Sequence, residues 1–253
     1  MRYNLGAHSD IGNGRRLQED YMMFREYGKD ILAVIADGTG TTDNRIQPAV
    51  MAVTSIINEI SEIKEQNDSL FQQDPQFFLE RAMMNANNVI GTLKLADEET
   101  YNGYAASVSA VYLTESGMIY CSHAGNTRVY ILRNSGLLQL TEDHTVAAEQ
   151  VNNGELDIGH YYFSPNRLRM TNGIGLMAKP KLYQQTGRVK ENDLILLTTD
   201  GVHYAFMGED NAIVQIILNS TDIVDASEKL VMAAKEVERF SDNMAAMLIG
   251  VSS

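Results

Sequence analysis

The sequence predicts an α+β fold, on three observations about the order of its segments. Two short apolar runs, 31–36 and 194–199, each end in an Asp-Gly pair and are typical of buried strands. Further strand-like segments lie between them, and the helical patterns fall in two separate pairs. Strands and helices therefore do not alternate as they would in a βαβ protein.

The two apolar runs each bring an aspartate to the end of a core strand. Ile31–Ala36 leads directly into Asp37-Gly38, and Leu194–Thr199 leads into Asp200-Gly201. An Asp-Gly pair after a strand is far more often a simple turn than a metal site. Taken alone, neither aspartate predicts a function.

A first helix pair follows the first buried strand. Segment 46–64 carries apolar residues at helical spacing, and a second helix is expected from Asp74-Pro75, a good N-cap and first-turn pair, to about Leu95. A second pair is expected over 211–218 and 225–240, before a last strand at 244–251 that is entered from Ser241-Asp242-Asn243.

Between the buried strands the pattern predicts a β-meander. Short turns that contain Gly or Asn separate the strand-like segments, which is a hairpin signal. The segments are 106–114, 118–124, 127–133 and 137–140. With no internal repeat and no linker in the sequence, residues 1–253 are expected to form a single domain.

The composition excludes several classes of protein. The 20 basic and 33 acidic residues give a net charge of −13, which disfavours binding to nucleic acid or to an anionic membrane surface. The sequence contains neither a signal-peptide pattern nor an apolar run long enough to span a bilayer, so we expect a cytoplasmic protein. The single cysteine, Cys121, permits no intrachain disulfide and no Cys-rich zinc site, and we expect it to be a packed residue.

Five short segments carry the chemistry when they are taken together. Each is weak alone, but their order and their positions at strand ends are far more specific. They are Gly14–Asp20, Ala36–Gly40, Gly125–Arg128, Thr199–Gly201 and Ser241–Asn243.

In this order the segments resemble the motifs of the PPM family (PP2C type) of bacterial metal-dependent serine/threonine protein phosphatases. The likeness includes the stretch Leu137–His144 and extends from residue 7 to about residue 251. It implies a four-layer α-β-β-α sandwich, two antiparallel sheets flanked by helix pairs, with the carboxylates at one end. It also implies a flap-like segment at about 146–169.

The resemblance assigns a role to each candidate site residue. Clustered carboxylates without Cys or His partners favour Mn²⁺ or Mg²⁺ over zinc. The family pattern implies that Asp37 bridges two cations with the Gly38 carbonyl as a further ligand, that Asp200 and Asp242 hold one cation, and that Glu19 and Asp20 act on the other.

The implied reaction is hydrolysis of phosphoserine and phosphothreonine in proteins, on substrates of a serine/threonine kinase. Two cations about 3.5–4 Å apart activate a shared water for attack on phosphorus. Arg15 is expected to grip the phosphate with its planar guanidinium. Arg15, Asp20 and Asp37 are thus the expected catalytic residues.

The sequence departs from the family pattern at several positions near these motifs. Asn126 stands where bacterial members have an aspartate that helps to bind a third metal, so a third site is expected to be weak or absent. Thr41 replaces a glycine, Gln18 replaces an asparagine, and Thr39 stands where eukaryotic members commonly have a histidine.

Two other functions stay open at this point. One is a degenerate regulatory or binding module with weak or no catalysis, which Asn126 and Thr41 favour. The other is an enzyme of the same chemistry that acts on a non-protein phosphate. Three histidines, His123, His144 and His203, lie near the motifs, and we expect them to be structural.

Overall fold

The two buried strands lie in two different five-stranded sheets of the computed structural model, which describes residues 1–41, 46–237 and 242–253. The first sheet has the order β1-β10-β9-β6-β7 and the second β2-β3-β4-β5-β8, and all paired strands are antiparallel. The strands of the first sheet are β1 (Arg2–Asp10), β6 (Arg128–Arg133), β7 (Gly136–Gln139), β9 (Leu194–Thr198) and β10 (Met244–Ser252). Those of the second sheet are β2 (Asp20–Tyr27), β3 (Asp30–Thr39), β4 (Ala105–Leu113), β5 (Met118–Ala124) and β8 (Tyr183–Arg188).

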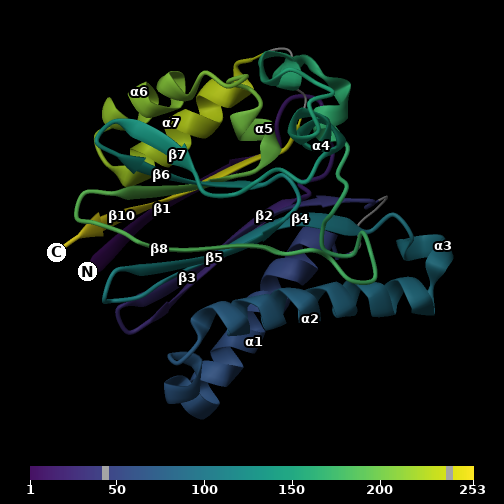
Figure 1. The fold of residues 1–253 in the computed structure, drawn as a ribbon, viewed down its shortest axis with the longest axis horizontal. Coiled ribbons are helices and arrows are strands. Elements are labelled where there is room, and N and C mark those ends of the chain that lie inside the picture. Colours follow the sequence, from purple (N-terminus) through teal and green to yellow (C-terminus); the bar gives the residue numbers. More distant parts are fainter. Residues whose placement is uncertain (42–45, 238–241) are drawn as a thin grey trace.

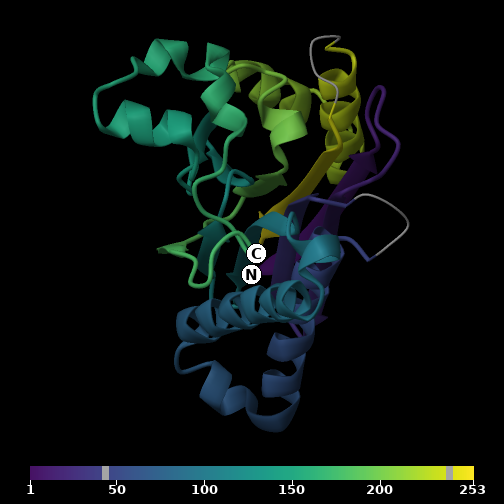
Figure 2. The same ribbon diagram turned by 90° about the vertical axis from the view of Figure 1, so that its right-hand side faces the viewer.

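Helices cover the outer face of each sheet, so that the molecule has four layers (Figure 1). In Figure 2, α1 and α2 lie below the sheets, and the helices that follow β7 in the chain lie above them. Below lie α1 (Pro48–Phe71) and α2 (Pro75–Ala96), with the short α3 (Glu98–Tyr101) after them. Above lie α4 (Val146–Asn152), α5 (Asp200–His203), α6 (Asp210–Leu218), α7 (Ile223–Lys235) and the 3₁₀ turns η1 (Ile158–Phe163) and η2 (Pro165–Leu168). The predicted α+β sandwich is thereby confirmed.

Both faces of the central strands are buried, which explains why their sequences are apolar without alternation. In β3, Ala33 and Ile35 pack between the two sheets, while Leu32 and Val34 pack under α1 and α2. Leu196 of β9 packs under α6 and α7, in a third cluster. This double burial fixes the strand ends, and with them the aspartates that follow.

The helix boundaries differ from the predicted ones by a few residues. Asp74 caps α2 as predicted, accepting a hydrogen bond of 3.0 Å from the Phe77 N–H. The helix expected over 225–240 begins instead at Ile223, because Asp222 caps it, and ends at Lys235. Residues 238–240 of that prediction, like Ser241, lie outside the described residues.

The predicted meander is wrong at one turn. The strands β4 and β5 do form a hairpin, but β6 belongs to the other sheet, where it pairs with β7 and β9. The chain leaves the second sheet at Gly125, whose φ of +118° favours glycine. The hydroxyl of Ser107 then accepts hydrogen bonds of 2.7 and 2.6 Å from the N–H groups of Asn126 and Thr127, which holds the crossing in place.

One end of the sandwich carries the chain termini and the other carries the candidate site. Arg2 pairs with Ser252 at the terminal end, while Asp10 pairs with Met244 at the far end of the same two strands. Asp20 and Asp37 are cross-strand partners at the site end of the second sheet. None of the helices in the described ranges has the length and apolarity to cross a bilayer.

Candidate metal centre

The structure brings four predicted aspartates together at one end of the two sheets. Asp20 begins β2 and Asp37 lies near the end of β3, while Asp200 follows β9 and Asp242 precedes β10. A hydrogen bond joins the two sheets here, because the Thr199 hydroxyl donates to Asp20 Oδ2 at 2.7 Å. The aspartates therefore share one site although 222 positions separate the first from the last in the sequence.

Asp20 and Asp37 form the part of the site that comes from the second sheet. Asp20 is 4% exposed, while Asp37 keeps some solvent contact. Burial raises the pKa of Asp20 well above its ordinary value, and the nearby charges of Asp200 and Asp242 raise it further. Burial likewise raises the pKa of Asp37 well above its ordinary value, with Asp200 and Asp20 as the strongest charged neighbours.

Asp200 and Asp242 form the part from the first sheet. Burial and the charge of Asp242 raise the pKa of Asp200 to about 7. Burial also raises the pKa of Asp242, although Arg15 opposes the shift. The Arg15 Nη2 lies 2.5 Å from Asp242 Oδ1, which places the guanidinium at the rim of the site, with 40% of its side chain exposed.

The segment with Arg15 and Glu19 is held against the start of β10 by Asn243. The Asn243 amide donates to the carbonyls of Ile11 and Leu17 at 2.8 and 2.9 Å, and its oxygen accepts from the Glu19 N–H at 2.8 Å. Asn243 thus positions the segment that carries Glu19. The motif comparison had given Asn243 no role. Its signal in the sequence is its place directly after Asp242.

Two glycines permit close backbone contacts at this end. Gly12 has φ +76°, and a Cβ there would lie 1.8 Å from the Asp242 carbonyl oxygen. A Cβ on Gly38 would lie 2.9 Å from the carbonyl oxygen of Glu19, which accepts the Gly38 N–H at 3.0 Å. The Glu19 carboxylate in turn accepts a hydrogen bond of 3.3 Å from the Thr41 N–H.

Asn126 contacts the candidate site directly. Its amide nitrogen donates to Asp200 Oδ2 at 2.9 Å. The side chain is 2% exposed, and its Oδ1 has no hydrogen-bond partner among the described residues. A buried amide oxygen without a donor is costly, so Asn126 leaves an unsatisfied acceptor beside Asp200.

The carboxylate oxygens of the site suit Mn²⁺ or Mg²⁺, but their present arrangement is not one that would hold an ion. Within 1–41, 46–237 and 242–253, Asp20, Asp37 and Asp200 make no ion pair with Lys, Arg or His, and the charge of Arg15, which pairs with Asp242, offsets the rise in the pKa of Asp200 only in part. In the same ranges, no group of three acidic, His or Cys side chains is arranged to hold a metal ion. Three of the aspartates instead make contacts within the protein. These are Asp242 with Arg15, Asp200 with Asn126, and Asp20 with Thr199.

The three histidines serve the fold around this site. His123 is fully buried, and its Nε2 donates to the carbonyls of Gly125 and Glu142 at 3.0 Å each. Burial lowers the pKa of His123 to about 4. His144 Nδ1 accepts from the Gly125 N–H at 3.1 Å, so both rings hold the turn before Asn126. Burial lowers the pKa of His203 well below its ordinary value.

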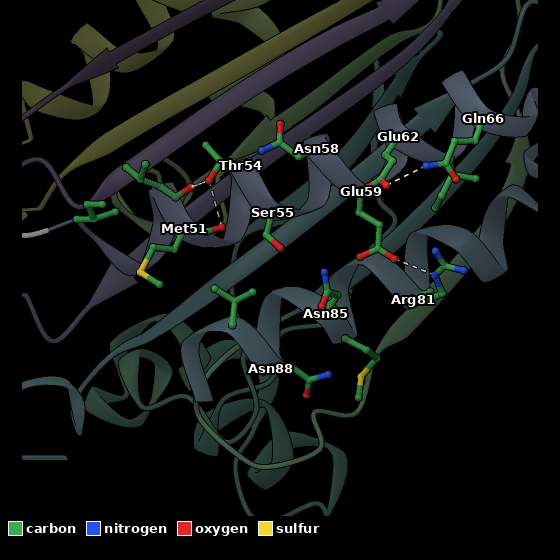
Figure 3. Close-up of a pocket in the computed structure, with 15 residues that line it drawn as sticks. Met51, Thr54, Ser55, Asn58, Glu59, Glu62, Gln66, Arg81, Asn85 and Asn88 are labelled. Atoms are coloured by element: carbon green, nitrogen blue, oxygen red, sulfur yellow. Dashed lines mark hydrogen bonds and ion pairs between the residues drawn. The ribbon is translucent and has the colours of Figure 1, made fainter. Parts of the chain in front are cut away.

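Two further features lie apart from the aspartates. Cys121 is fully buried between the sheets, and burial raises its pKa to about 12, so it is a packed thiol. A hollow of about 890 Å³ lies between α1 and α2, where Arg81 pairs with Glu59 at 2.8 Å (Figure 3). The sequence proposes seven site residues, and none of them is among the described residues that line this hollow. The seven are Arg15, Glu19, Asp20, Asp37, Gly38, Asp200 and Asp242.

Comparison with known proteins relates the whole arrangement to one family. The family model described as Protein phosphatase 2C matches residues 8–248. Protein phosphatase PhpP of Streptococcus pneumoniae is 24% identical over 250 residues, which cover 96% of each protein.

Solved structures of the same kind share the fold. The serine/threonine phosphatase Stp1 from Staphylococcus aureus superposes with a TM-score of 0.86 at 19% identity, over 100% of this chain and 96% of that one. The catalytic domain of the serine/threonine protein phosphatase PstP, solved with two manganese ions, superposes with a TM-score of 0.79 at 19% identity, over 99% of each chain.

Proposed function

This chain belongs to the protein phosphatase 2C family, and we propose that it hydrolyses phosphoserine and phosphothreonine in proteins in a reaction that requires divalent cations. The observation that carries the proposal is the cluster of Asp20, Asp37 and Asp200, whose pKa values are raised by burial and by neighbouring carboxylates and which make no ion pair with a cationic side chain in the described ranges. Such a group is costly in a folded protein unless it serves a site. Two divalent cations would supply the missing charge.

We propose that the seven candidate residues divide the work as the family pattern implies. Asp37 would bridge the two cations with the Gly38 carbonyl as a further ligand, Asp200 and Asp242 would hold one cation, and Glu19 and Asp20 would hold the other. Bound Mn²⁺ or Mg²⁺ ions lower the pKa of a water and neutralise phosphate charge. The protein's part is to fix these oxygens at the ends of rigid strands, so that attack on phosphorus needs little reorganisation.

Arg15 is proposed to bind the phosphate of the substrate. In the structure its guanidinium contacts Asp242 at the exposed rim of the site. A guanidinium carries five N–H donors in a planar fork that suits phosphate oxygens. Arg15 would thereby both orient Asp242 and receive the substrate.

Asn126 supports a centre with two cations and no third. Its amide nitrogen donates to Asp200 Oδ2, so this carboxylate oxygen is already engaged. A neutral amide is also a weaker ligand than the carboxylate it replaces in the family pattern. We therefore propose that the reaction proceeds with two ions.

The same contacts favour one alternative, a regulatory module with weak or no catalysis. Asp242 and Asp200 are engaged by Arg15 and Asn126, and cations must compete with these contacts. The enzyme is the better supported proposal, because the match to Protein phosphatase 2C covers residues 8–248 and Asp20, Asp37 and Asp200 make no ion pair with a cationic side chain in the described ranges.

A hydrolysis assay separates these proposals. We expect p-nitrophenyl phosphate and a phosphothreonine peptide to be hydrolysed with Mn²⁺ and not with EDTA. Asp37→Asn should lower the rate about ten-thousandfold, roughly 5 kcal/mol, because it removes the shared ligand. No turnover with any metal, from folded protein, would favour the regulatory module. Turnover of the small ester alone would favour a non-protein substrate.

The two-ion proposal has its own test. Asn126→Asp should raise the rate at high Mn²⁺ concentration and not at low concentration, because it adds a charged ligand beside Asp200. Asn126→Ala, which removes the amide without adding charge, is the matched control. An unchanged or lower rate for Asn126→Asp across the whole Mn²⁺ range would contradict the proposal that Asn126 is what limits the centre to two ions.

Three further proposals follow from the sequence. Residues 1–253 form one domain, and the pairing of β1 with β10 supports this because strands from residues 2–10 and 244–252 are neighbours in one sheet. Residues 146–169 form the flap of that domain. The substrates are proteins phosphorylated by a serine/threonine kinase in the cytoplasm.

A further inference from the structure

The loop that carries Arg15 is held in place by polar contacts rather than by packing. Residues 11–19 connect β1 to β2 and form neither helix nor strand. Among these nine positions, all of which the structure describes, Gly12 alone is buried. A segment with few buried apolar contacts has little local stability of its own. The position of Arg15 therefore depends on the hydrogen bonds and ion pairs that the loop makes with its neighbours.

One of these neighbours is Lys235, the last residue of α7. Lys235 Nζ donates to Asp10 Oδ2 at 2.9 Å, and the other oxygen, Asp10 Oδ1, accepts the Gly12 N–H at 2.7 Å. The side chains of Lys235 and Asp10 are 30% and 20% exposed, so the pair is partly screened from water. The hydrogen bond from Lys235 lowers the pKa of Asp10. Lys235 thus fixes the carboxylate that shapes the start of the loop.

The backbone of the same lysine holds a second point of the loop. The carbonyl oxygen of Lys235 accepts a hydrogen bond of 2.9 Å from the Asn13 amide. This carbonyl belongs to the last turn of α7, where carbonyl groups lack a partner within the helix. Lys235 therefore contacts the chain both at Asp10 and at Asn13, two positions before Arg15.

The helix that supplies Lys235 is a rigid base for these contacts. Its side chains Leu230, Val231 and Ala234 are buried in the cluster that covers the first sheet. A Cβ on Gly6 of β1 would lie 2.3 Å from the carbonyl oxygen of Ile223, so the start of α7 lies directly against that strand. A loop bound to such an element keeps one position relative to the sheet.

The contacts of Asn243 fix a different part of the loop. They join its two ends, because the Asn243 amide donates to the carbonyls of Ile11 and Leu17. Residues 12–16, with Arg15 among them, lie between these two points. Within 12–16 it is Asn13 that Lys235 contacts. Asn243 therefore closes the base of the loop, and Lys235 holds the part nearer to Arg15.

We propose that Lys235 is a positioning residue for phosphate binding and that it acts through Arg15. The inference rests on the proposed function, in which Arg15 binds the phosphate of the substrate. The ammonium group of Lys235 is engaged by Asp10, so its part is to hold the loop. Without this pair the loop has more conformations open to it, and ordering them opposes phosphate binding.

Titration of Mn²⁺-loaded protein with inorganic phosphate tests the inference without turnover. We expect Arg15→Met to weaken phosphate binding about thirtyfold, because it removes a charged donor. Lys235→Met should weaken it about fivefold, the cost of ordering a loop that is no longer held. When Arg15→Met is already present, Lys235→Met should have no further effect, because the side chain that it positions is gone.

Lys229→Met is the matched control, because it makes the same substitution in the same helix and removes an exposed ion pair with Asp225. It should leave phosphate affinity unchanged. Lys235→Arg keeps a cation for Asp10 and should retain most of the affinity. Thermal unfolding verifies that each variant is folded. Asp10→Asn, which breaks the same pair from its other side, replaces Lys235→Met if that variant does not fold.

Three outcomes contradict the inference, and they differ from one another. Unchanged phosphate affinity in folded Lys235→Met overturns it. A fivefold loss both with and without Arg15→Met also overturns it, because Lys235 would then act on the site as a whole and not through Arg15. Failure of Mn²⁺-loaded wild type to bind any phosphate overturns the proposed function as well.

Discussion

Asp143 and the aspartates of the candidate site have opposite electrostatic surroundings. At Asp143 burial disfavours ionisation, but the charge and hydrogen bonds of Arg128 outweigh it and hold the pKa well below its ordinary value. At Asp20, Asp37 and Asp200, burial and mutual repulsion raise the pKa values, and the described residues supply no cationic side chain in ion-pair contact.

The difference separates a structural carboxylate from a functional one. The Asp143 charge is balanced inside the protein, so it strengthens the fold that exists. The other three carboxylates have no ion-pair partner in the described ranges, and the charge of Arg15 offsets the rise in the pKa of Asp200 only in part. Like charges placed close together lower the stability of the fold, so such a cluster indicates a ligand site. Divalent cations bind oxygen donors of this kind.

The largest expected effect comes from breaking the balanced pair. Arg128→Met leaves the Asp143 charge buried without its partner, which costs about 3–5 kcal/mol of unfolding free energy. Urea denaturation in EDTA measures the loss. Lys229→Met removes an exposed pair with Asp225 within one helix and should leave the transition almost unchanged. A loss for Arg128→Met as small as that of the control would contradict the structural role of Asp143.

The pH dependence of metal-free protein sharpens the contrast. The folded pKa of Asp200, about 7, lies above the ordinary 3.8, so its contribution to stability is present below pH 3.8 and is lost as pH rises toward 7. Asp143 has the opposite sign: its contribution is present above pH 3.8 and is lost as pH falls toward its lowered pKa.

We therefore expect wild type in EDTA to lose roughly 2–4 kcal/mol relative to Asp200→Asn between pH 4 and pH 7.5. Unfolding curves of both proteins across that range provide the measurement. Saturating Mn²⁺ should remove the difference, since bound cations favour the ionised form. Parallel pH profiles for the two proteins would show that Asp200 is not strained by its neighbours.

A smaller effect is expected at the hydrogen bond to Asp20. Thr199→Val removes the hydroxyl that orients this carboxylate, and Mn²⁺ affinity should fall about tenfold, as for other residues that orient metal ligands. Thr199→Ser keeps the hydroxyl and should retain affinity. Calorimetric titration of both variants measures the effect, and equal losses in both would point to packing rather than to the hydrogen bond.

Sequence patterns located the buried strands and the motif residues because burial on both faces leaves an unmistakable apolar run. They did not identify β1, β2 or β8, since β1 has one buried residue, β8 has none, and β2 carries charged residues on both of its sides. The passage of β6 to the other sheet depends on contacts of Ser107 with residues 19 and 20 positions away. Local hairpin signals do not contain that information.

The candidate site was predictable as a set of residues but not as a set of contacts. Motif order proposed the seven candidates, whose roles stay predictions, whereas the contacts of Thr199 with Asp20 and of Asn243 with Glu19 arise only when two sheets face each other. The engagement of Asp200 by Asn126 is likewise a consequence of three-dimensional proximity.

The most direct test of the account is calorimetric titration of metal-free protein with Mn²⁺, beside Asp37→Asn. The account predicts two ions per wild-type chain, a rise in the thermal midpoint on binding, and loss of at least one ion from the variant. It also predicts that metal-free Asp37→Asn is no less stable than wild type, because it removes a repelling charge. No Mn²⁺ binding by the wild type, or equal binding by the variant, would contradict the claim that the unbalanced aspartates form a metal centre.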